Sequence, residues 1–270
     1  MKKHSPVRAL LALIAALALL GTAGCGAPQQ SPAPEQSAAA SPVPTAAPTP
    51  EPTPEPTPEP TPEPTPDMSP LGREFFDDAV FLGDSISRSF EVYIYRTGEL
   101  GEPDFVTQDS FSVRSALMTN GLVYLGGKHV SFSEAIAETG KSRLFILLGS
   151  NDVGVGGVER TMENWESFLA MIREQNPDID IYIQSCTPMF SSAQDQKFNN
   201  ALIDEYNERL RLFAEENGCC FVDIATTLKD EDGNLRAELT QDNYVHLNKE
   251  GCQLWIEALR DPSNYSDLKR

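Results

Sequence analysis

Three short segments of this chain carry residue types that together could cleave an ester. They are Gly83-Asp84-Ser85, Gly149-Ser150-Asn151-Asp152, and the stretch 242–248, which contains His246. A serine hydroxyl is a poor nucleophile until an imidazole removes its proton, and a tetrahedral oxyanion needs fixed hydrogen-bond donors. The chain therefore contains the side chains that nucleophilic acyl transfer requires.

Each segment also has an ordinary structural interpretation. Gly83–Ser85 could be a turn with a helix cap, Gly149–Asp152 a turn that ends a strand, and His246 a surface histidine. Among the three histidines, His4 falls in an N-terminal signal, and His129 has no acidic neighbour close in sequence and precedes a helix start. His246 is therefore the candidate base.

The order of apolar runs and helical patterns indicates the elements that must position these residues. Alternation of strands and helices predicts a parallel sheet with helices on both faces, and such sheets bind ligands beyond the carboxyl ends of their strands. The three segments fall at or near such positions. We expect strands at 79–82, 104–107, 144–148, 181–184 and 219–224, and helices at 131–140 and 158–175, through 198–213 and around 254–259.

Taken together, these segments resemble the SGNH hydrolases, also called the GDSL esterase/lipase family. The resemblance covers about residues 71–260 and implies a flavodoxin-like three-layer α/β/α sandwich with a five-stranded parallel sheet, which agrees with the strands above. The G-x-S-x-G elbow of lipase-type α/β-hydrolases is not present, because Ser87 stands where its second glycine would be. The implied activity is that of a serine esterase.

The resemblance also implies roles for individual residues. Ser85 corresponds to the nucleophile and its backbone N–H to one oxyanion donor, Asn151 supplies a second donor from its amide, and His246 is the general base and then the general acid. The family usually has a glycine as a third donor, and Ser110 stands at that place. Its backbone N–H remains, but a turn that needs a positive φ would be strained there.

The residue that orients His246 is open at this point. The family usually places an aspartate three residues before the histidine, where this chain has Asn243, and Asp242 lies four residues before it. Either the loop is bulged by one residue and Asp242 orients the ring, or Asn243 or a backbone carbonyl does so. We favour Asp242, because a neutral partner would stabilise imidazolium less.

The first part of the chain indicates a secretion signal. Basic residues precede an unbroken apolar run at 9–20, which is too short to span a membrane. Gly21-Thr22-Ala23-Gly24-Cys25 resembles a bacterial lipobox, which implies a signal peptide at 1–24 and lipid on Cys25. We therefore expect the protein to be secreted across the cytoplasmic membrane and held on its outer face, at the bacterial cell surface, by acyl chains alone.

A spacer and one domain follow this signal. Between Pro28 and Pro70 the chain holds 16 of its 21 prolines, many in a TPEP repeat. Proline at every second position prevents helix and sheet, so we expect a disordered polyproline-II stalk at 25–70. The hydrolase domain is then expected at 71–270.

The charge of the chain restricts its partners. The formal net charge is −19, and the 18 basic and 34 acidic residues from Ser69 onward leave about −16 in the domain. Such a surface repels phosphate backbones, which excludes nucleic-acid binding. It also favours a substrate that is neutral around its scissile ester, and we expect the protein to act as a monomer.

No cofactor and no metal are expected. Residues 230–233 (Asp-Glu-Asp-Gly) suggest a calcium loop, but Leu228 and Leu239 stand at ligand positions, so a turn is the better interpretation. The domain's cysteines have no histidine beside them, and their spacing leaves their disulfide pairing open. These cysteines are Cys186, Cys219, Cys220 and Cys252.

The substrate class follows only from the expected location. A domain carried on a stalk at the cell surface favours removal of O-acetyl groups from a cell-wall or exogenous polysaccharide. A lysophospholipase or thioesterase acting on lipids is the alternative enzyme. A degenerate SGNH module that binds glycan without cleaving it is the alternative from another class.

Overall fold

A five-stranded parallel sheet forms the centre of the structure, a computed structural model that describes residues 67–269. Its spatial order is β2-β1-β5-β6-β7, a flavodoxin-like order, which confirms the predicted fold class. The strands are mostly buried, as their apolar runs require. They span Ala79–Gly83 (β1), Asp104–Thr107 (β2), Arg143–Leu147 (β5), Asp180–Gln184 (β6) and Cys220–Val222 (β7).

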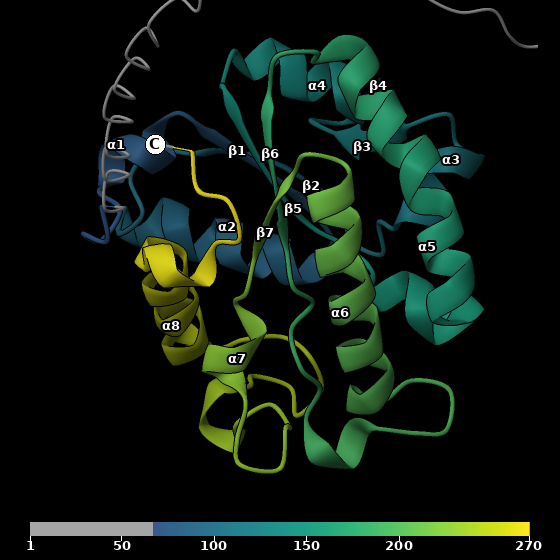
Figure 1. Cartoon of the computed structure of the whole chain (residues 1–270), viewed down its shortest axis with the longest axis vertical. Helices are drawn as coiled ribbons and strands as arrows, with labels where there is room; N and C mark the ends of the chain where they lie inside the picture. The colour runs from purple at the N-terminus through teal and green to yellow at the C-terminus, as the bar shows by residue number, and fades with distance from the viewer. Residues whose placement is uncertain (1–66, 270) are drawn as a thin grey trace, which may run out of the picture. The chain divides into compact units, whose positions relative to one another are not determined.

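Helices cover both faces of this sheet (Figure 1). Helices α2 and α8 lie on one side, and α5 and α6 lie on the other. Three-residue 3-10 helices at Ser191–Ala193, Ala237–Leu239 and Pro262–Asn264 lie between or after them. The α-helices are α1 Arg73–Asp77, α2 Ser85–Thr97, α3 Val113–Met118, α4 Phe132–Thr139, α5 Ser150–Gln175, α6 Asn200–Glu216, α7 Ala225–Leu228 and α8 Lys249–Arg260.

Aromatic side chains tie four strands together on one face of the sheet. The strand register places Phe81 beside Phe105 and Phe145, and Phe145 beside Tyr182. The stacked rings have centroid separations of 5.3, 4.9 and 4.7 Å along this row. Phe90 of α2 contacts Phe81 from above, so the row anchors the helix that begins at the candidate nucleophile.

The boundary of one predicted strand is wrong, and one predicted helix is preceded by a helical segment that is not predicted. Helix α5 spans Ser150–Gln175 but is broken at Gly157 (φ 75°, ψ 173°). The predicted helix at 158–175 is its second part, and residues 150–156, for which no helix is predicted, form its first turns. Glycine lowers helix propensity, but Val153 is buried and Gly154 lies so close to Phe198 that a Cβ on it would be 3.2 Å from that ring, so tertiary packing holds these turns in place. Strand β7 is also shorter than the predicted 219–224.

A small hairpin outside the main sheet has no counterpart in the predicted elements. Strands β3 (Leu122–Leu125) and β4 (Lys128–Ser131) pair antiparallel through Gly126 and Gly127, which both have positive φ. His129 lies on β4 and meets the Tyr124 ring edge to face at 5.2 Å. His129 therefore packs against Tyr124 within the hairpin.

The structure also shows the state of the cysteines and the conformation of the acidic segment 230–233. All four cysteines of the domain are buried free thiols, so Cys252 pairs with neither Cys219 nor Cys220. The segment 230–233 is a turn, in which Asp230 N–H donates to Asn234 O and Gly233 has a φ of 80°.

Several predictions concern residues 1–66, which lie outside the described part of the chain. They are the signal at 1–24, lipid on Cys25 and most of the stalk at 25–70, and they remain predictions, as does the domain boundary at 71. Within the described residues, no helix is long and apolar enough to cross a membrane.

Candidate active site

The switch point of the sheet brings the three chemically suggestive segments together. Strands β1 and β5 are neighbours, although β2 to β4 separate them in sequence. Their carboxyl ends lead into Ser85, which begins helix α2, and into Asn151, which lies in the first turn of helix α5. In doubly wound sheets this is the crevice where ligands bind.

A hydrogen-bonded relay joins Asp242, His246 and Ser85. His246 Nε2 lies 2.9 Å from Ser85 Oγ, and His246 Nδ1 lies 2.6 Å from Asp242 Oδ2. Such a carboxylate holds the imidazole in the tautomer whose Nε2 can accept the serine proton. The geometry is thus suited to proton transfer from Ser85.

The loop around Asn243 explains why Asp242 occupies this position. Asn243 has a φ of 53°, a left-handed conformation that asparagine tolerates better than most residues. Asp242 Oδ1 also accepts the Tyr244 N–H at 2.9 Å. The structure therefore places Asp242, and not Asn243, against the ring of His246.

The pKa of the Asp242 carboxyl is consistent with its contact with the His246 ring. Partial burial acts to raise the pKa of Asp242, but hydrogen bonds from the His246 ring and the Tyr244 N–H outweigh it, so the pKa lies below its ordinary value. The group is ionised at neutral pH. It can therefore stabilise a positive charge on the imidazole.

Ser85 is held at the first turn of α2 by its neighbours in sequence. Asp84 caps the helix by accepting the Ile86 N–H at 2.9 Å. A Cβ on Gly83 would lie 2.0 Å from Ser87 Oγ, so glycine is needed for the strand and helix to meet this closely. The helix cap and the hydrolase interpretation of this segment are therefore compatible.

The candidate oxyanion donors come from two other strand ends. The Asn151 Nδ2 group donates to Asp84 Oδ2 at 2.9 Å and to Phe111 O at 3.3 Å. Ser110 precedes Phe111 and has a φ of 59°, so the strain anticipated for a serine at the family's glycine position is present. The Asn151 amide is thus fixed between the loops that follow β1 and β2.

Asp152 is a positioning residue that the sequence reasoning did not identify. Its carboxylate accepts the Val113 N–H at 3.0 Å and the Arg114 N–H at 2.9 Å. It thereby binds the first turn of α3 to the start of α5. Burial raises the pKa of Asp152, although these two backbone donors oppose the shift. The sequence signal for this role is the position of Asp152 directly after Asn151, the candidate oxyanion donor.

Gly149 allows α5 to begin at this point. Its φ of 136° is a conformation that other residues rarely adopt, and a Cβ there would lie 2.3 Å from the Tyr206 ring. The Tyr206 hydroxyl in turn donates to Leu148 O at 2.9 Å and accepts from Trp165 Nε1 at 2.8 Å. The buried pair of aromatic residues therefore supports the loop that carries Asn151.

Replacing Asp84 by Asn is expected to change both activity and the pH dependence of stability. Burial raises the pKa of Asp84 from 3.8 to about 6, although the Ile86 N–H and the His246 charge oppose it. The folded protein therefore binds more protons than the unfolded chain between these values, so this carboxyl makes stability fall as pH rises from about 4 to 6. The full change in the free energy of unfolding is roughly 3 kcal/mol.

In Asp84→Asn this pH dependence disappears, while one oxygen is replaced by an NH2 that cannot accept from Asn151. Thermal unfolding from pH 4 to 7 should give a flatter curve for the variant, and its turnover should fall by about tenfold or more because an oxyanion donor is displaced. Parallel stability curves for the two proteins would contradict the assignment of the titrating group.

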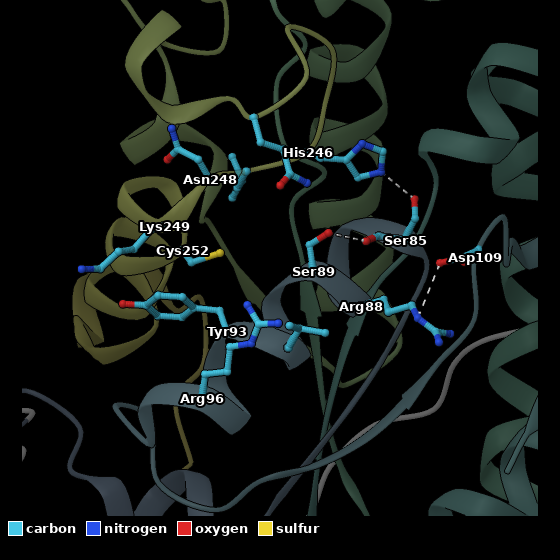
Figure 2. Close-up of a pocket in the computed structure, with 13 residues that line it drawn as sticks. Ser85, Arg88, Ser89, Tyr93, Arg96, Asp109, His246, Asn248, Lys249 and Cys252 are labelled. Atoms are coloured by element: carbon cyan, nitrogen blue, oxygen red, sulfur yellow. Dashed lines mark hydrogen bonds and ion pairs between the residues drawn. The ribbon is translucent and has the colours of Figure 1, made fainter.

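Two cavities flank the Ser85–His246 pair. Cavity A, of about 590 Å³, extends between α2 and the start of α8 (Figure 2). Cavity B, of about 420 Å³, lies on the Asn151 side and includes Gly154 and Phe198. The two cavities give an ester room on both sides of the serine. No group of histidine, cysteine and carboxylate side chains in residues 67–269 is arranged to hold a metal ion.

Comparison with solved structures gives the same fold at low sequence identity. A protein of Streptococcus pneumonia provisionally named a platelet activating factor aligns with a TM-score of 0.53 at 22% identity, over 67% of this chain and 81% of its own. A GDSL-like lipase from Bacteroides thetaiotaomicron aligns with a TM-score of 0.52 at 18% identity, over 70% of this chain and 89% of its own.

A third similar structure is from Bacteroides fragilis and is provisionally named an acylhydrolase. It aligns with a TM-score of 0.53 at 19% identity, over 67% of this chain and 83% of its own. No curated protein sequence matches the chain.

The family model for GDSL-like lipases and acylhydrolases matches residues 81–254. This range contains all three candidate segments, the last three residues of β1 and the other four strands of the main sheet. The chain therefore belongs to the GDSL-like lipase/acylhydrolase family.

Proposed function

We propose that this protein is a serine esterase that hydrolyses its substrate through an acyl-Ser85 intermediate. The observation that carries the proposal is the contact of His246 with both Ser85 Oγ, at 2.9 Å, and Asp242 Oδ2, at 2.6 Å. A capped helix start alone would not require a histidine from the far end of the domain beside this serine. Membership of an acylhydrolase family supports the same reaction class.

The reaction begins when Ser85 Oγ attacks the ester carbonyl and its proton passes to His246 Nε2. The Ser85 backbone N–H and the Asn151 amide stabilise the oxyanion, and the amide proton directed at Phe111 O is available because that 3.3 Å contact is the longer of its two. The protonated histidine then donates to the leaving alcohol, which leaves acyl-Ser85. A water molecule activated by His246 releases the acid and restores the serine.

The favoured substrate is an O-acetyl group on a cell-wall or exogenous polysaccharide. Polar side chains are prominent in the lining of cavity A, among them Ser89, Gln241 and Asn248. These side chains can form hydrogen bonds with the hydroxyls of a sugar. Lipid esters or thioesters are the alternative substrates, and binding without cleavage is the alternative function.

Acyl chain length separates these functions. The purified protein should turn over 4-nitrophenyl acetate with a kcat/KM at least about tenfold above that for 4-nitrophenyl octanoate, and it should release acetate from an acetylated oligosaccharide. Preference for octanoate would favour the lipid hydrolase. Glycan binding without acetate release from any ester would favour the module that binds without cleaving.

We also place the enzyme on the outer face of the cytoplasmic membrane. Gly21–Cys25 and the apolar run before it support this location. Intact-mass measurement of membrane-extracted protein should show a chain that starts at Cys25 and carries acyl mass. An N-terminus elsewhere, or a mass without lipid, would contradict the anchor.

A further inference from the structure

The lining of cavity A is cationic although the chain as a whole is acidic. Arg88, Arg96 and Lys249 line it, and Asp109 is the only carboxylate among its lining residues. The chain carries a formal net charge of −19. Three cationic side chains around one cavity are unexpected in a chain with this net charge. The charge that lines the cavity is opposite in sign to the net charge of the chain.

These cations are largely free to bind an anion. Arg88 Nε lies 3.9 Å from Asp109 Oδ1, and both side chains are more than half exposed, so this pair is weak. Within residues 67–269, no hydrogen bond or ion pair involves the side chains of Arg96 or Lys249. The neighbouring Glu99 accepts the Tyr93 hydroxyl at 3.0 Å and does not line the cavity.

The cations are spread along a path that begins at the nucleophile. Ser85, Arg88, Val92 and Arg96 recur at helical spacing and form one stripe of α2. At 1.5 Å per residue, Arg88 lies about one turn from Ser85 and Arg96 lies roughly 16 Å along the helix. Figure 2 shows Arg96 on α2 and Lys249 on α8, with Ser85 and His246 at one end of the drawn residues and the Lys249 side chain pointing away from Ser85.

The second wall adds to the positive potential. Helix α8 begins at Lys249 with Asn248 as its cap, so its N-terminal end lies along the cavity. The N-terminus of a helix carries a partial positive charge. The cavity therefore has cationic side chains on both walls, and Glu250 is the acidic residue in the first turn of α8.

We infer that cavity A binds the anionic part of an extended substrate, and that the natural ester is carried by an acidic glycan. The negative groups, carboxylate or phosphate, lie one to three helical turns of α2 from the ester, over Arg88, Arg96 and Lys249. This inference rests on the proposed esterase function and specifies its substrate class. It differs from the neutral substrate that net charge alone favours, because the charges that line the cavity act at shorter range than the rest of the surface.

Charge-matched variants test the inference. Arg96→Gln/Lys249→Gln removes two charges from the cavity, and Arg160→Gln/Lys128→Gln removes two exposed charges that line neither cavity. Each protein is compared on acetylated polygalacturonate oligomers, an acetylated sugar-phosphate polymer and acetylated neutral xylo-oligosaccharides, at 50 and 500 mM salt. Thermal unfolding shows whether each variant is folded.

The wild type should prefer both acidic substrates at low salt and lose most of that preference at high salt. The cavity variant should lose about fivefold to tenfold of the acidic-to-neutral ratio of kcat/KM, through KM, while the surface variant keeps the wild-type ratio. The relative rates on the carboxylate and phosphate polymers identify the source of the anion. A wild type that prefers neutral oligosaccharides, or equal losses in both variants, would overturn the inference.

A binding measurement keeps the inference testable if the proposed esterase function fails. Ser85→Ala alone and in combination with either pair of substitutions is titrated calorimetrically with the acidic oligomers. Weaker binding only with Arg96→Gln/Lys249→Gln would support the anionic subsite even if no ester were cleaved. Equal binding by all three proteins, or selective binding to vesicles of anionic lipid instead of the oligomers, would refute it.

Discussion

Replacement of Ser85 by Ala is expected to reduce ester turnover by roughly 10⁴- to 10⁶-fold, the largest effect of any single change in this protein. Without Oγ no acyl-enzyme can form, and the remaining rate comes from oxyanion stabilisation and binding alone. Release of 4-nitrophenol from 4-nitrophenyl acetate measures the loss. Covalent labelling by a fluorophosphonate probe should disappear in the same variant.

Ser263→Ala is the matched control, because Ser263 is exposed and hydrogen-bonded to Asp261 in the last 3-10 helix. It should keep wild-type turnover and labelling. If Ser85→Ala were labelled and turned over ester as the wild type does, Ser85 would not be the nucleophile and the proposed function would be wrong.

The second large effect is expected at Asp242. Asp242→Ala removes the carboxylate 2.6 Å from His246 Nδ1, so the ring loses both its preferred tautomer and the stabilisation of imidazolium. We expect kcat to fall by roughly 10³- to 10⁴-fold. Asp242→Asn retains the size of the side chain and should lose nearly as much, because the amide cannot supply the charge.

Asn243→Gly is the control for this effect. Glycine adopts the left-handed conformation of Asn243 (φ 53°) without strain, so the loop keeps its path and kcat should change less than about threefold. Stopped-flow or steady-state kinetics with 4-nitrophenyl acetate compare the variants. A large loss only in the Asn243 variant would show that Asn243 orients the histidine.

Much of the fold could be predicted from local patterns. Strands β1, β5 and β6 are buried on both faces, so each is a short apolar run bounded by polar or glycine residues. Helix α6 shows its buried stripe at Ile203, Tyr206, Leu210 and Phe213. Alternation of these signals is sufficient to predict a doubly wound parallel sheet.

Other elements could not be predicted because distant contacts decide them. The first turns of α5 are rich in glycine, which disfavours helix locally. Phe198, a residue 44 positions later in the chain, lies so close to Gly154 that a Cβ there would be 3.2 Å from its ring. The hairpin β3–β4 depends on two glycines with positive φ and has little buried apolar surface to mark it. Local propensity is overridden wherever such packing is available.

By itself, the sequence determined which reactive groups this protein has and the strand ends from which they project. Ser85 and Asn151 could be named because the segments around them resemble motifs of the SGNH hydrolases, and His246 because few histidines compete with it. Only the tertiary structure decided that Asp242, one position earlier than the usual spacing, meets His246, because that depends on the left-handed Asn243.

The tertiary structure likewise decided the electrostatics of the site. The sum of charges in the sequence is negative, but the potential felt by a bound substrate depends on which side chains lie within about a Debye length of it, and Arg88, Arg96 and Lys249 are gathered there by α2 and α8. The buried contacts of Asp84 and Asp152 have the same origin, since they join residues 67 and 39 positions apart. Net charge is additive along a chain, whereas burial and proximity exist only once it has folded.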